Sequence, residues 1–149
     1  MDSNYDALKL ENQLCFPLYA CSKEVVKKYK PFLDELDITY TQYITLMVLW
    51  EHKEISVKEL GSYLYLDSGT LTPVLKSLEK KGLVSRNRSK DDERVLIVSI
   101  TNKGYALRDK AVDIPSKMTS CVSLDMDEAK ELYRLLYKVL SKVHEAEND

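Results

Sequence analysis

The spacing of apolar residues predicts a chain made mainly of α-helices. Apolar residues recur every three or four positions in six stretches, which is the spacing of one face of a helix. These stretches cover residues 8–30, 39–52, 56–64, 68–81, 101–114 and 125–143. Two short aliphatic runs predict β-strands joined by a long polar loop, and they are residues 83–86 and 95–100. The predicted fold class is mainly α with a small β-hairpin.

Capping residues and prolines mark where the helices begin and end. Two pairs have the spacing of a capping box, and they are Thr39 with Gln42 and Ser56 with Glu59. Thr101 and Asp125 are expected to open the last two helices, and Gly82 to end the fourth. An interior proline costs roughly 3 kcal/mol in a helix. The first helix therefore either starts near Pro17 or is kinked there.

Two further prolines limit other helices for the same reason. Pro31 is expected to end the first helix, and Pro115 to disturb the helix that follows Thr101, whose residues Ala106, Leu107, Ala111 and Ile114 are expected to face inward.

Residues 55–100 combine a short helix, a second helix and a basic hairpin, which is the order of a winged helix. Ser68 is expected to cap the second helix, although Pro73 allows a later start near Thr70. The apolar residues of this helix form one stripe, and its other face carries small hydrogen-bonding groups followed by lysines. Such a face can lie in the major groove of DNA.

Positive charge is concentrated in the same segment. The chain has a net charge of −2, whereas residues 76–90 hold six Lys or Arg against one acid, Glu79. A local basic patch in an acidic chain indicates contact with the phosphate backbone, so double-stranded DNA is the expected partner.

Individual residues of this segment receive predicted roles. Candidate contacts to base edges are Gly69, Thr70 and Thr72. Candidate contacts to phosphates are Ser68, Lys76, Arg86, Arg88 and Lys90. Arg94 fits insertion into a minor groove. Alternatively, Asp92 holds Arg94 as a brace of the wing, and both roles stay open.

Composition removes several function classes. A chain of 149 residues with 44% hydrophobic and 31% charged residues is expected to form one soluble domain, 1–149. Its apolar runs are far shorter than the ~20 residues that span a bilayer, and no signal peptide is visible, so we expect a cytoplasmic protein without membrane contact. Three irregularly spaced cysteines and two histidines indicate no disulfide framework, metal site or cofactor.

The last predicted helix carries a wide apolar stripe at the end of the chain. Its members are Leu132, Leu135, Leu136, Val139, Leu140 and Val143. A monomer of this size offers little to cover such a stripe, so we expect a homodimer. In this organisation the terminal segments 1–38 and 101–149 dimerise and flank a winged helix-turn-helix core, 39–100.

The order of elements resembles the MarR family of dimeric bacterial transcription regulators. Asp92-Glu93-Arg94, followed by a strand and Thr101, is similar to the wing signature of that family, and residues 66–73 are similar to its recognition-helix entry. Residues 10–16, with Tyr19, Tyr29-Lys30-Pro31 and 38–43, resemble the organic hydroperoxide resistance regulators. This branch senses peroxides through one N-terminal cysteine, and the resemblance covers nearly the full chain.

The resemblance implies a role for Cys15 as the sensing thiol. In that branch the thiol is held by tyrosines of the partner subunit, at positions that match Tyr29 and Tyr40, with Tyr19 nearby. Phenol donors stabilise a thiolate, which is the form that attacks a peroxide. Oxidation to sulfenic acid would then strain the dimer interface and change the spacing of the two recognition helices.

The step after sulfenic acid formation stays open. Some members of the branch form a mixed disulfide with a low-molecular-weight thiol or are over-oxidised, whereas others form a disulfide with a late cysteine of the partner chain. Cys121 is the candidate for that resolving thiol, and Cys21 is expected to pack as a small residue.

Together these features predict a homodimeric repressor that is not an enzyme. It would bind a pseudo-palindromic operator and release it when an organic hydroperoxide oxidises Cys15. One alternative is a regulator released by a phenolic or apolar ligand lodged among the tyrosines, with Cys15 structural. A less favoured alternative is a thiol peroxidase, because no recycling group is visible in the sequence.

Overall fold

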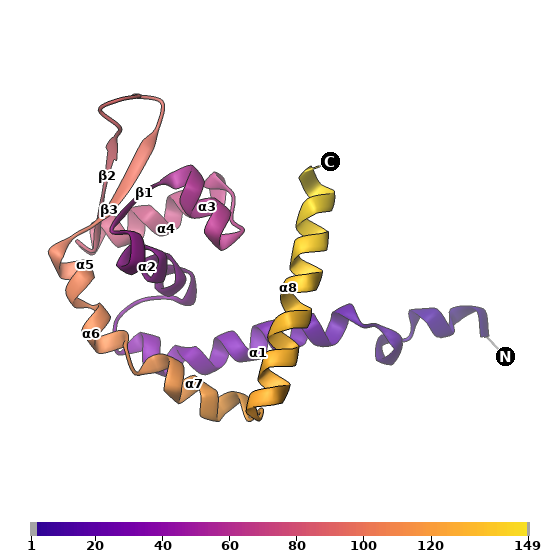
Figure 1. Ribbon diagram of the computed structural model, residues 1–149. Helices are drawn as coiled ribbons and strands as arrows, with labels where there is room; N and C mark the ends of the chain where they lie inside the picture. The colour runs from indigo at the N-terminus through magenta and orange to yellow at the C-terminus, as the bar shows by residue number, and fades with distance from the viewer. Residues whose placement is uncertain (1–2, 149) are drawn as a thin grey trace. The chain divides into compact units, whose positions relative to one another are not determined.

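The computed structural model describes residues 3–148, most of which are helical (Figure 1). The helical elements are η1 (Ser3–Leu8), η2 (Leu10–Asn12), α1 (Cys15–Asp34), α2 (Tyr40–His52), α3 (Val57–Leu64), α4 (Ser68–Lys80), α5 (Asn102–Ala106), α6 (Arg108–Ala111), α7 (Ile114–Val122) and α8 (Met126–Asn148). The strands are β1 (Glu54–Ser56), β2 (Val84–Arg88) and β3 (Leu96–Ile100). The chain forms two compact units, the first ending at Ile114 and the second beginning at Pro115. Among the described residues, no helix is both long and apolar enough to cross a lipid bilayer.

Helix α1 begins at Cys15, which places Pro17 in its first turn. The amides of a first turn have no partner within the helix, so a proline there removes no hydrogen bond. The residues before Cys15 form the 3-10 turns η1 and η2, and the Asn12 side chain donates to the Asp6 carbonyl at 2.7 Å. Of the two alternatives for this helix, a start near Pro17 is confirmed.

The prediction that Pro31 ends α1 is wrong, because the helix continues to Asp34. Burial holds this last turn together, since Leu33 is only 2% exposed. Burying a leucine contributes roughly 1.5–3 kcal/mol, which offsets much of the cost of an interior proline. The amides of Leu36 and Ile38 also donate to the Leu33 carbonyl, at 3.0 and 3.1 Å, and close the helix end.

Helices α2, α3 and α4 pack with a three-stranded antiparallel sheet in the order β1-β3-β2. The fully buried side chains are Leu46, Leu49, Leu60, Leu71, Leu75, Leu78, Val98 and Thr45. The predicted hairpin is β2–β3, which pairs from Val84 with Ile100 to Arg88 with Leu96 and so runs two residues beyond the predicted end. Strand β1 was not predicted, because three residues between two helices show no periodicity. It pairs Ile55 with Val98.

Local caps set most of the helix starts. Both halves of the Thr39–Gln42 capping box form, at 3.0 and 3.3 Å, and the Ser56 hydroxyl accepts the Glu59 amide at 3.1 Å. These predicted starts are confirmed. The return bond from the Glu59 side chain stays a prediction.

The cap of α4 is Asp67, so the prediction of Ser68 as its cap, or of a start near Thr70, is wrong. The Asp67 carboxylate accepts the Thr70 amide at 2.7 Å, and a carboxylate one residue earlier reaches this amide in the usual capping geometry. Pro73 remains inside the helix, because the buried residues Leu71, Leu75 and Leu78 hold both sides of it.

Gly82 follows α4 with φ +77°, as predicted for the end of this helix. Its amide donates to the Glu79 carbonyl at 2.9 Å, and the Leu83 amide donates to the Leu78 carbonyl at 3.0 Å. These two bonds make a Schellman motif, which turns the chain from α4 directly into β2.

The single helix predicted after Thr101 is wrong in its extent. Thr101 does cap α5, accepting the Gly104 amide at 3.0 Å, but regular helix stops at Ala106 and resumes as α6. The Gly104 carbonyl accepts the Trp50 indole N–H at 2.9 Å, at the point where α5 would continue. Ala111 and Ile114 are buried as predicted, whereas Ala106 is exposed. Pro115 lies in the first turn of α7.

The second unit contains α8, whose predicted start is confirmed. Asp125 and Glu128 form a capping box, with the Glu128 amide donating to Asp125 at 2.9 Å and the Asp125 amide donating to Glu128 at 3.2 Å. Five of the six residues of the predicted apolar stripe are exposed, by 41–57%: Leu132, Leu135, Leu136, Val139 and Val143.

Candidate DNA interface and thiol site

The first turn of α4 presents small polar groups to solvent. Ser68, Gly69 and Thr70 are exposed, and Thr72 is half-buried, with its hydroxyl donating to the Ser68 carbonyl at 2.7 Å. Hydrogen bonds from the amide and side chain of Thr70, and from the Gly69 amide, lower the pKa of the Asp67 carboxyl. Lys76 is exposed two turns from the start of the helix. The predicted base and phosphate contacts of α4 are therefore accessible.

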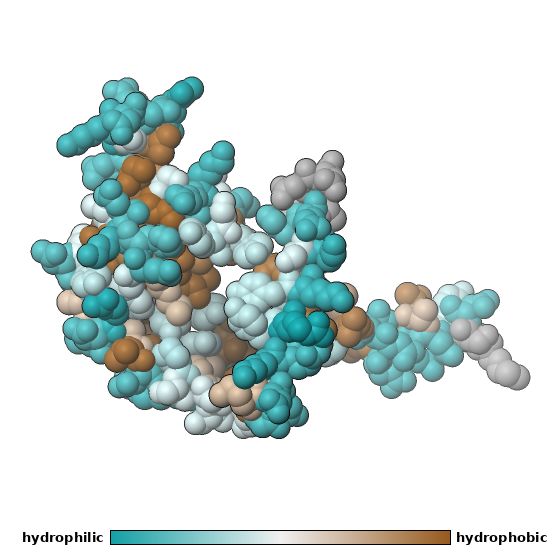
Figure 2. Space-filling model, viewed as in Figure 1, coloured by the Kyte–Doolittle hydropathy of each residue, from teal (hydrophilic) through white to brown (hydrophobic). Residues whose placement is uncertain are grey.

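The wing is the hairpin of β2 and β3 with the loop between them. Its tip is hydrophilic, and hydrophobic surface appears at its base (Figure 2). Arg88 and Lys90 are exposed there, as a phosphate-contacting role requires.

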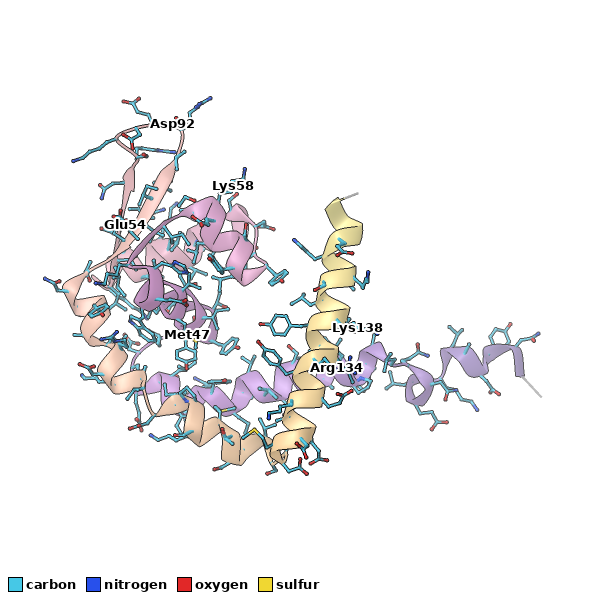
Figure 3. All side chains as sticks on the ribbon, in the orientation of Figure 1. Met47, Glu54, Lys58, Asp92, Arg134 and Lys138 are labelled. Carbon is cyan, nitrogen blue, oxygen red and sulfur yellow. The ribbon has the colours of Figure 1, made fainter. Side chains whose placement is uncertain are left out.

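Arg94 is paired with Asp92, which is labelled at the wing in Figure 3. The guanidinium donates from Nε and Nη2 to the two carboxylate oxygens, at 3.0 and 3.1 Å, and the Arg94 amide donates to the same carboxylate at 3.0 Å. These bonds lower the pKa of Asp92. The Arg94 side chain is still 90% exposed, so the brace geometry leaves its guanidinium accessible to DNA.

Arg86 is the least accessible of the predicted phosphate contacts, because its side chain is only 18% exposed. The Glu79 carboxylate accepts the Arg86 amide at 3.1 Å and its guanidinium at 3.2 Å, which lowers the pKa of Glu79. Glu79 thus ties the end of α4 to the start of the wing. This role of Glu79 was not predicted from the sequence, although the two residues flank the Gly82 turn.

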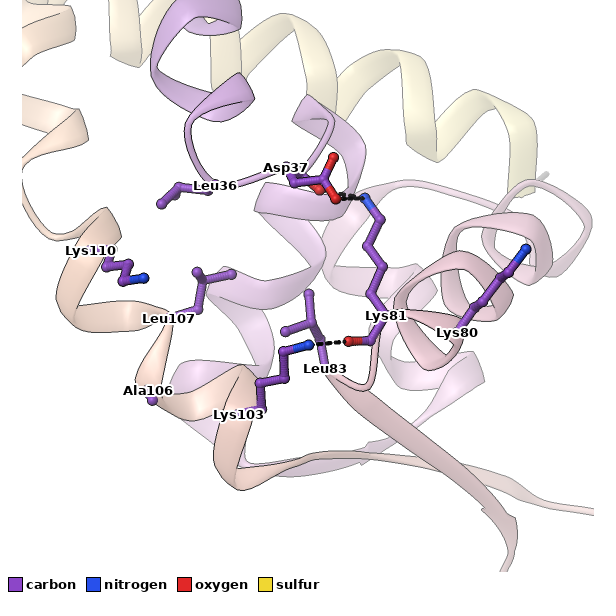
Figure 4. A pocket seen from close by; sticks show the side chains of 9 residues that line it. All are labelled: Leu36, Asp37, Lys80, Lys81, Leu83, Lys103, Ala106, Leu107 and Lys110. Carbon is purple, nitrogen blue, oxygen red and sulfur yellow. Dashed lines mark hydrogen bonds and ion pairs between the residues drawn. The ribbon is translucent and has the colours of Figure 1, made fainter.

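A basic pocket of about 590 Å³ lies beyond the C-terminal end of α4 (Figure 4). Its lining residues are Leu36, Asp37, Lys80, Lys81, Leu83, Lys103, Ala106, Leu107 and Lys110. Lys81 donates to the Asp37 carbonyl, and Lys103 donates to the Lys81 carbonyl at 2.9 Å. Three separate segments supply these residues, so no local sequence pattern could have indicated the pocket.

All three cysteines are free and exposed. Cys15 is the first residue of α1, and Tyr19, 60% exposed, lies one turn later on the same helix. Cys21, which is expected to pack as a small residue, is exposed on α1 in the single chain.

Tyr29 and Tyr40 belong to an aromatic cluster formed by α1 and α2. Their ring centroids are 4.9 Å apart, and Tyr43, which the sequence analysis did not single out, lies 5.8 Å from Tyr29. Tyr40 and Tyr43 are three positions apart on α2, the spacing at which side chains share a helix face. Burial raises the pKa of all three phenols. A tyrosine is ordinarily protonated in the neutral range, so these phenols can donate hydrogen bonds there.

Cys15 and this tyrosine cluster lie at opposite ends of one helix. Tyr29 follows Cys15 by fourteen positions, which places them about 20 Å apart at about 1.5 Å per residue. Within one chain the thiol and the phenols therefore cannot touch, and a contact between them requires a second chain.

Comparison with known proteins identifies the family. Residues 27–111 match the family model described as transcriptional regulator SarA/Rot. The organic hydroperoxide resistance transcriptional regulator of Bacillus subtilis (strain 168) is 50% identical over 145 residues, covering 97% of this chain and 99% of that protein.

Solved structures agree with this assignment. AbfR is a protein of Staphylococcus epidermidis. The structure of reduced AbfR bound to DNA has a TM-score of 0.77 and 35% identity, and the match covers 94% of this chain and 98% of the AbfR chain. Overoxidized AbfR bound to DNA has the same TM-score. A mutant MarR from E. coli complexed with operator DNA has a TM-score of 0.75 and 30% identity over 85% of this chain and 93% of its own. The chain therefore belongs to the MarR family of winged-helix transcription regulators, in the branch of the organic hydroperoxide resistance regulators.

Proposed function

We propose that this protein is a homodimeric repressor that binds a pseudo-palindromic DNA operator and releases it when an organic hydroperoxide oxidises Cys15. The observation that carries the proposal is the placement of an exposed thiol and a phenol cluster at opposite ends of α1. Two α1 helices crossing antiparallel about a two-fold axis would bring each thiol to the phenols of the partner. The exposed apolar residues Phe16, Leu18, Tyr19, Val25 and Val26 on α1 suit such a contact.

DNA binding would use α4 and the wing. The DNA-bound AbfR and MarR structures support a duplex DNA partner for this fold. The groups assigned to base edges are Gly69, Thr70 and Thr72, and those assigned to phosphates are Ser68, Lys76, Arg86, Arg88 and Lys90. Arg94 would reach the minor groove when DNA displaces it from Asp92. Two-fold symmetry then requires half-sites about one helical turn, or a multiple, apart.

The redox step is a two-electron transfer at sulfur. The Cys15 thiolate attacks the terminal oxygen of the hydroperoxide, so an S–O bond forms and the O–O bond breaks. The leaving alkoxide takes a proton and departs as an alcohol, and the thiolate becomes a sulfenic acid. Protonated phenols of the partner subunit, at the positions of Tyr29 and Tyr40, would hold the thiolate before attack.

Release of DNA follows from oxidation because the sulfenic acid carries an extra oxygen. That oxygen occupies the space in which the phenols had donated hydrogen bonds to sulfur. This steric conflict lies at the interface between the two chains, and it changes the separation of the two α4 helices. The sulfenic acid can then condense with a second thiol and lose water, giving a disulfide. Cys121 of the partner or a low-molecular-weight thiol would supply that second thiol.

A gel-shift series with a DNA duplex selected from a random-sequence library tests the proposal. Wild type and the Cys121→Ser and Cys21→Ser variants should lose the duplex after treatment with cumene hydroperoxide. Cys15→Ser should bind as well as wild type and keep the duplex after treatment. Retention of peroxide-driven release in Cys15→Ser would refute the sensing role of this thiol. Cys121 is the resolving thiol if, among the proteins that keep Cys15, only the Cys121→Ser variant lacks an intersubunit disulfide.

One observation favours a second mode of release. A pocket of about 260 Å³ lies beside Tyr40 and is lined in part by the apolar residues Val26, Leu33 and Ile38. A small phenolic ligand bound there would act on the same phenol cluster without any change at sulfur. In that case, adding the ligand under reducing conditions should release DNA from Cys15→Ser as well as from wild type.

A further inference from the structure

Gln42 is a buried polar residue with more hydrogen bonds than its capping role needs. Its side chain is 5% exposed, and its Oε1 accepts the Thr39 amide at 3.0 Å to complete the capping box of α2. Its Nε2 donates to the Ser77 hydroxyl of α4 at 2.8 Å. A capping box uses only the side-chain oxygen, so the amide nitrogen is left to join α2 to the recognition helix.

A second hydrogen bond to the Gln42 side chain comes from Lys81, the residue that follows α4. Lys81 follows Ser77 by one turn, and its ammonium donates to Gln42 Oε1 at 3.3 Å and to the Asp37 carbonyl. The contact between Lys81 and Asp37 is drawn in Figure 4. The last turn of α4, through Ser77, and the residue that follows the helix, Lys81, are therefore both bonded to the short α1–α2 junction, residues 37–42.

The same junction carries one of the proposed sensing phenols. Tyr40 is the first residue of α2, between Thr39 and Gln42, and its ring packs on Tyr29 at 4.9 Å. Because Tyr40 lies in the first turn of α2, a displacement of its ring would act on that turn. Chains of packed side chains and hydrogen bonds can couple two sites, and the Gln42–Ser77 bond adds a directional contact between α2 and α4 to their apolar packing.

We propose that Gln42, with Ser77 and Lys81, positions the recognition helix according to the state of the tyrosine cluster. In this arrangement the Gln42 amide is the mechanical link between the thiol site and α4. The inference rests on the proposed function, because it assigns the route by which oxidation of Cys15 alters DNA binding. Neither Gln42 nor Ser77 needs to contact DNA or peroxide for this role.

The substitution Ser77→Ala removes the acceptor on α4 and leaves the capping box of α2 intact. The matched control is Ser62→Ala, because Ser62 is a helical serine of the same unit whose hydroxyl donates only to the Lys58 carbonyl of its own helix. For each full-length protein, the Kd for the selected duplex is measured before and after treatment with cumene hydroperoxide. The fraction of oxidised Cys15 is measured by mass spectrometry on the same samples.

We expect the ratio of oxidised to reduced Kd to fall by roughly five- to ten-fold in Ser77→Ala, the effect of one hydrogen bond of ordinary strength. Cys15 should oxidise at the wild-type rate, and Ser62→Ala should keep the wild-type ratio. Lys81→Met removes the second bond and should lower the ratio independently, with a larger loss in the double variant.

An equal loss of affinity in both redox states, with the ratio unchanged, would overturn the link and leave Ser77 a purely structural residue. A wild-type ratio of one would instead contradict the proposed function itself, so the two failures are distinguishable.

Discussion

Arg94 is paired with Asp92 and is also exposed to solvent, so a role in DNA binding and a role in bracing the wing must be separated by measurement. Its guanidinium holds both oxygens of Asp92, yet nine-tenths of the side chain is open to solvent. Exposed ion pairs contribute little to stability, so DNA phosphates can compete for this arginine at small cost. The phenols of Tyr29, Tyr40 and Tyr43 differ, because they lie half-buried or buried in a cluster and burial raises their pKa further above neutral.

Replacing Arg94 by alanine should weaken DNA binding and reduce its dependence on salt. If Arg94 meets a phosphate, the slope of log Kd against log salt should fall by about one, because one fewer counterion is released. Anisotropy titrations at several salt concentrations measure the slope. Arg108→Ala is the control, since that guanidinium lies 4.2 Å over the Tyr105 ring. An unchanged slope in Arg94→Ala would assign the residue to bracing alone.

The Asp92 carboxyl should titrate below its ordinary pKa in the folded wing, because the Arg94 side chain and amide donate to its ionised form. A pKa lowered by folding adds stability that is present above the ordinary value of about 3.9. That stability is lost as pH falls through the lower, folded value. Carboxyl NMR titration should show the Asp92 pKa rising in Arg94→Ala. An identical Asp92 pKa in wild type and Arg94→Ala would show that the hydrogen bonds between the Arg94 guanidinium and Asp92 do not persist in solution.

At the scale of elements, helix starts set by neighbouring residues could be predicted from the sequence. Features that depend on contacts between distant segments could not. The capping boxes at Thr39 and Asp125 involve residues three apart, so their pattern is visible along the chain. The break after α5 depends on Trp50 donating to the Gly104 carbonyl, 54 residues away. Strand β1 likewise exists only because β3 pairs with it.

The residues of the candidate site also fall into a group that could be predicted from the sequence and a group that could not. Its residues on α4 and the wing lie within one segment and were predicted together. The Glu79–Arg86 pair, Tyr43 and the Gln42–Ser77 bond depend on contacts between elements, and they were not predicted.

Gly104, in α5, lies too close to Leu83, the residue before β2, for any side chain to fit. A Cβ there would stand 2.1 Å from the Leu83 carbonyl oxygen, so Gly104→Ala must push the two segments apart. We expect the free energy of unfolding to fall by about 1–3 kcal/mol, as for other overpacked sites. Gly69→Ala is the matched control, because its Cβ would meet only the Asp67 carboxylate, at 3.3 Å. Urea denaturation measures both, and equal stabilities would contradict this packing.

At the scale of the whole molecule, the apolar surface of α8 calls for a second chain. Five aliphatic residues of its stripe are exposed by 41–57% in the single chain, whereas monomeric proteins rarely leave such contiguous surface uncovered. A dimer would cover this stripe and would place two recognition helices on one duplex.

Leu136→Glu places a charge in the α8 stripe and should prevent dimerisation. Sedimentation should show a monomer, and affinity for the two-fold duplex should fall by roughly a hundred-fold or more, because each half-site then binds alone. Lys138, labelled on α8 in Figure 3, is not a member of the stripe, and Lys138→Glu, which introduces the same residue, should remain dimeric. A dimeric Leu136→Glu protein with wild-type affinity would place the interface elsewhere.

The central claim is that the oxidation state of Cys15 sets the affinity for DNA. The most direct test treats the dimer with increasing equivalents of cumene hydroperoxide and measures two quantities on each sample. Mass spectrometry gives the fraction of Cys15 converted to sulfenic acid or its disulfide, and anisotropy gives the Kd for the selected duplex. The account predicts that Kd rises in step with Cys15 oxidation and that Cys15→Ser shows no change. Fully oxidised Cys15 with an unchanged Kd would contradict it.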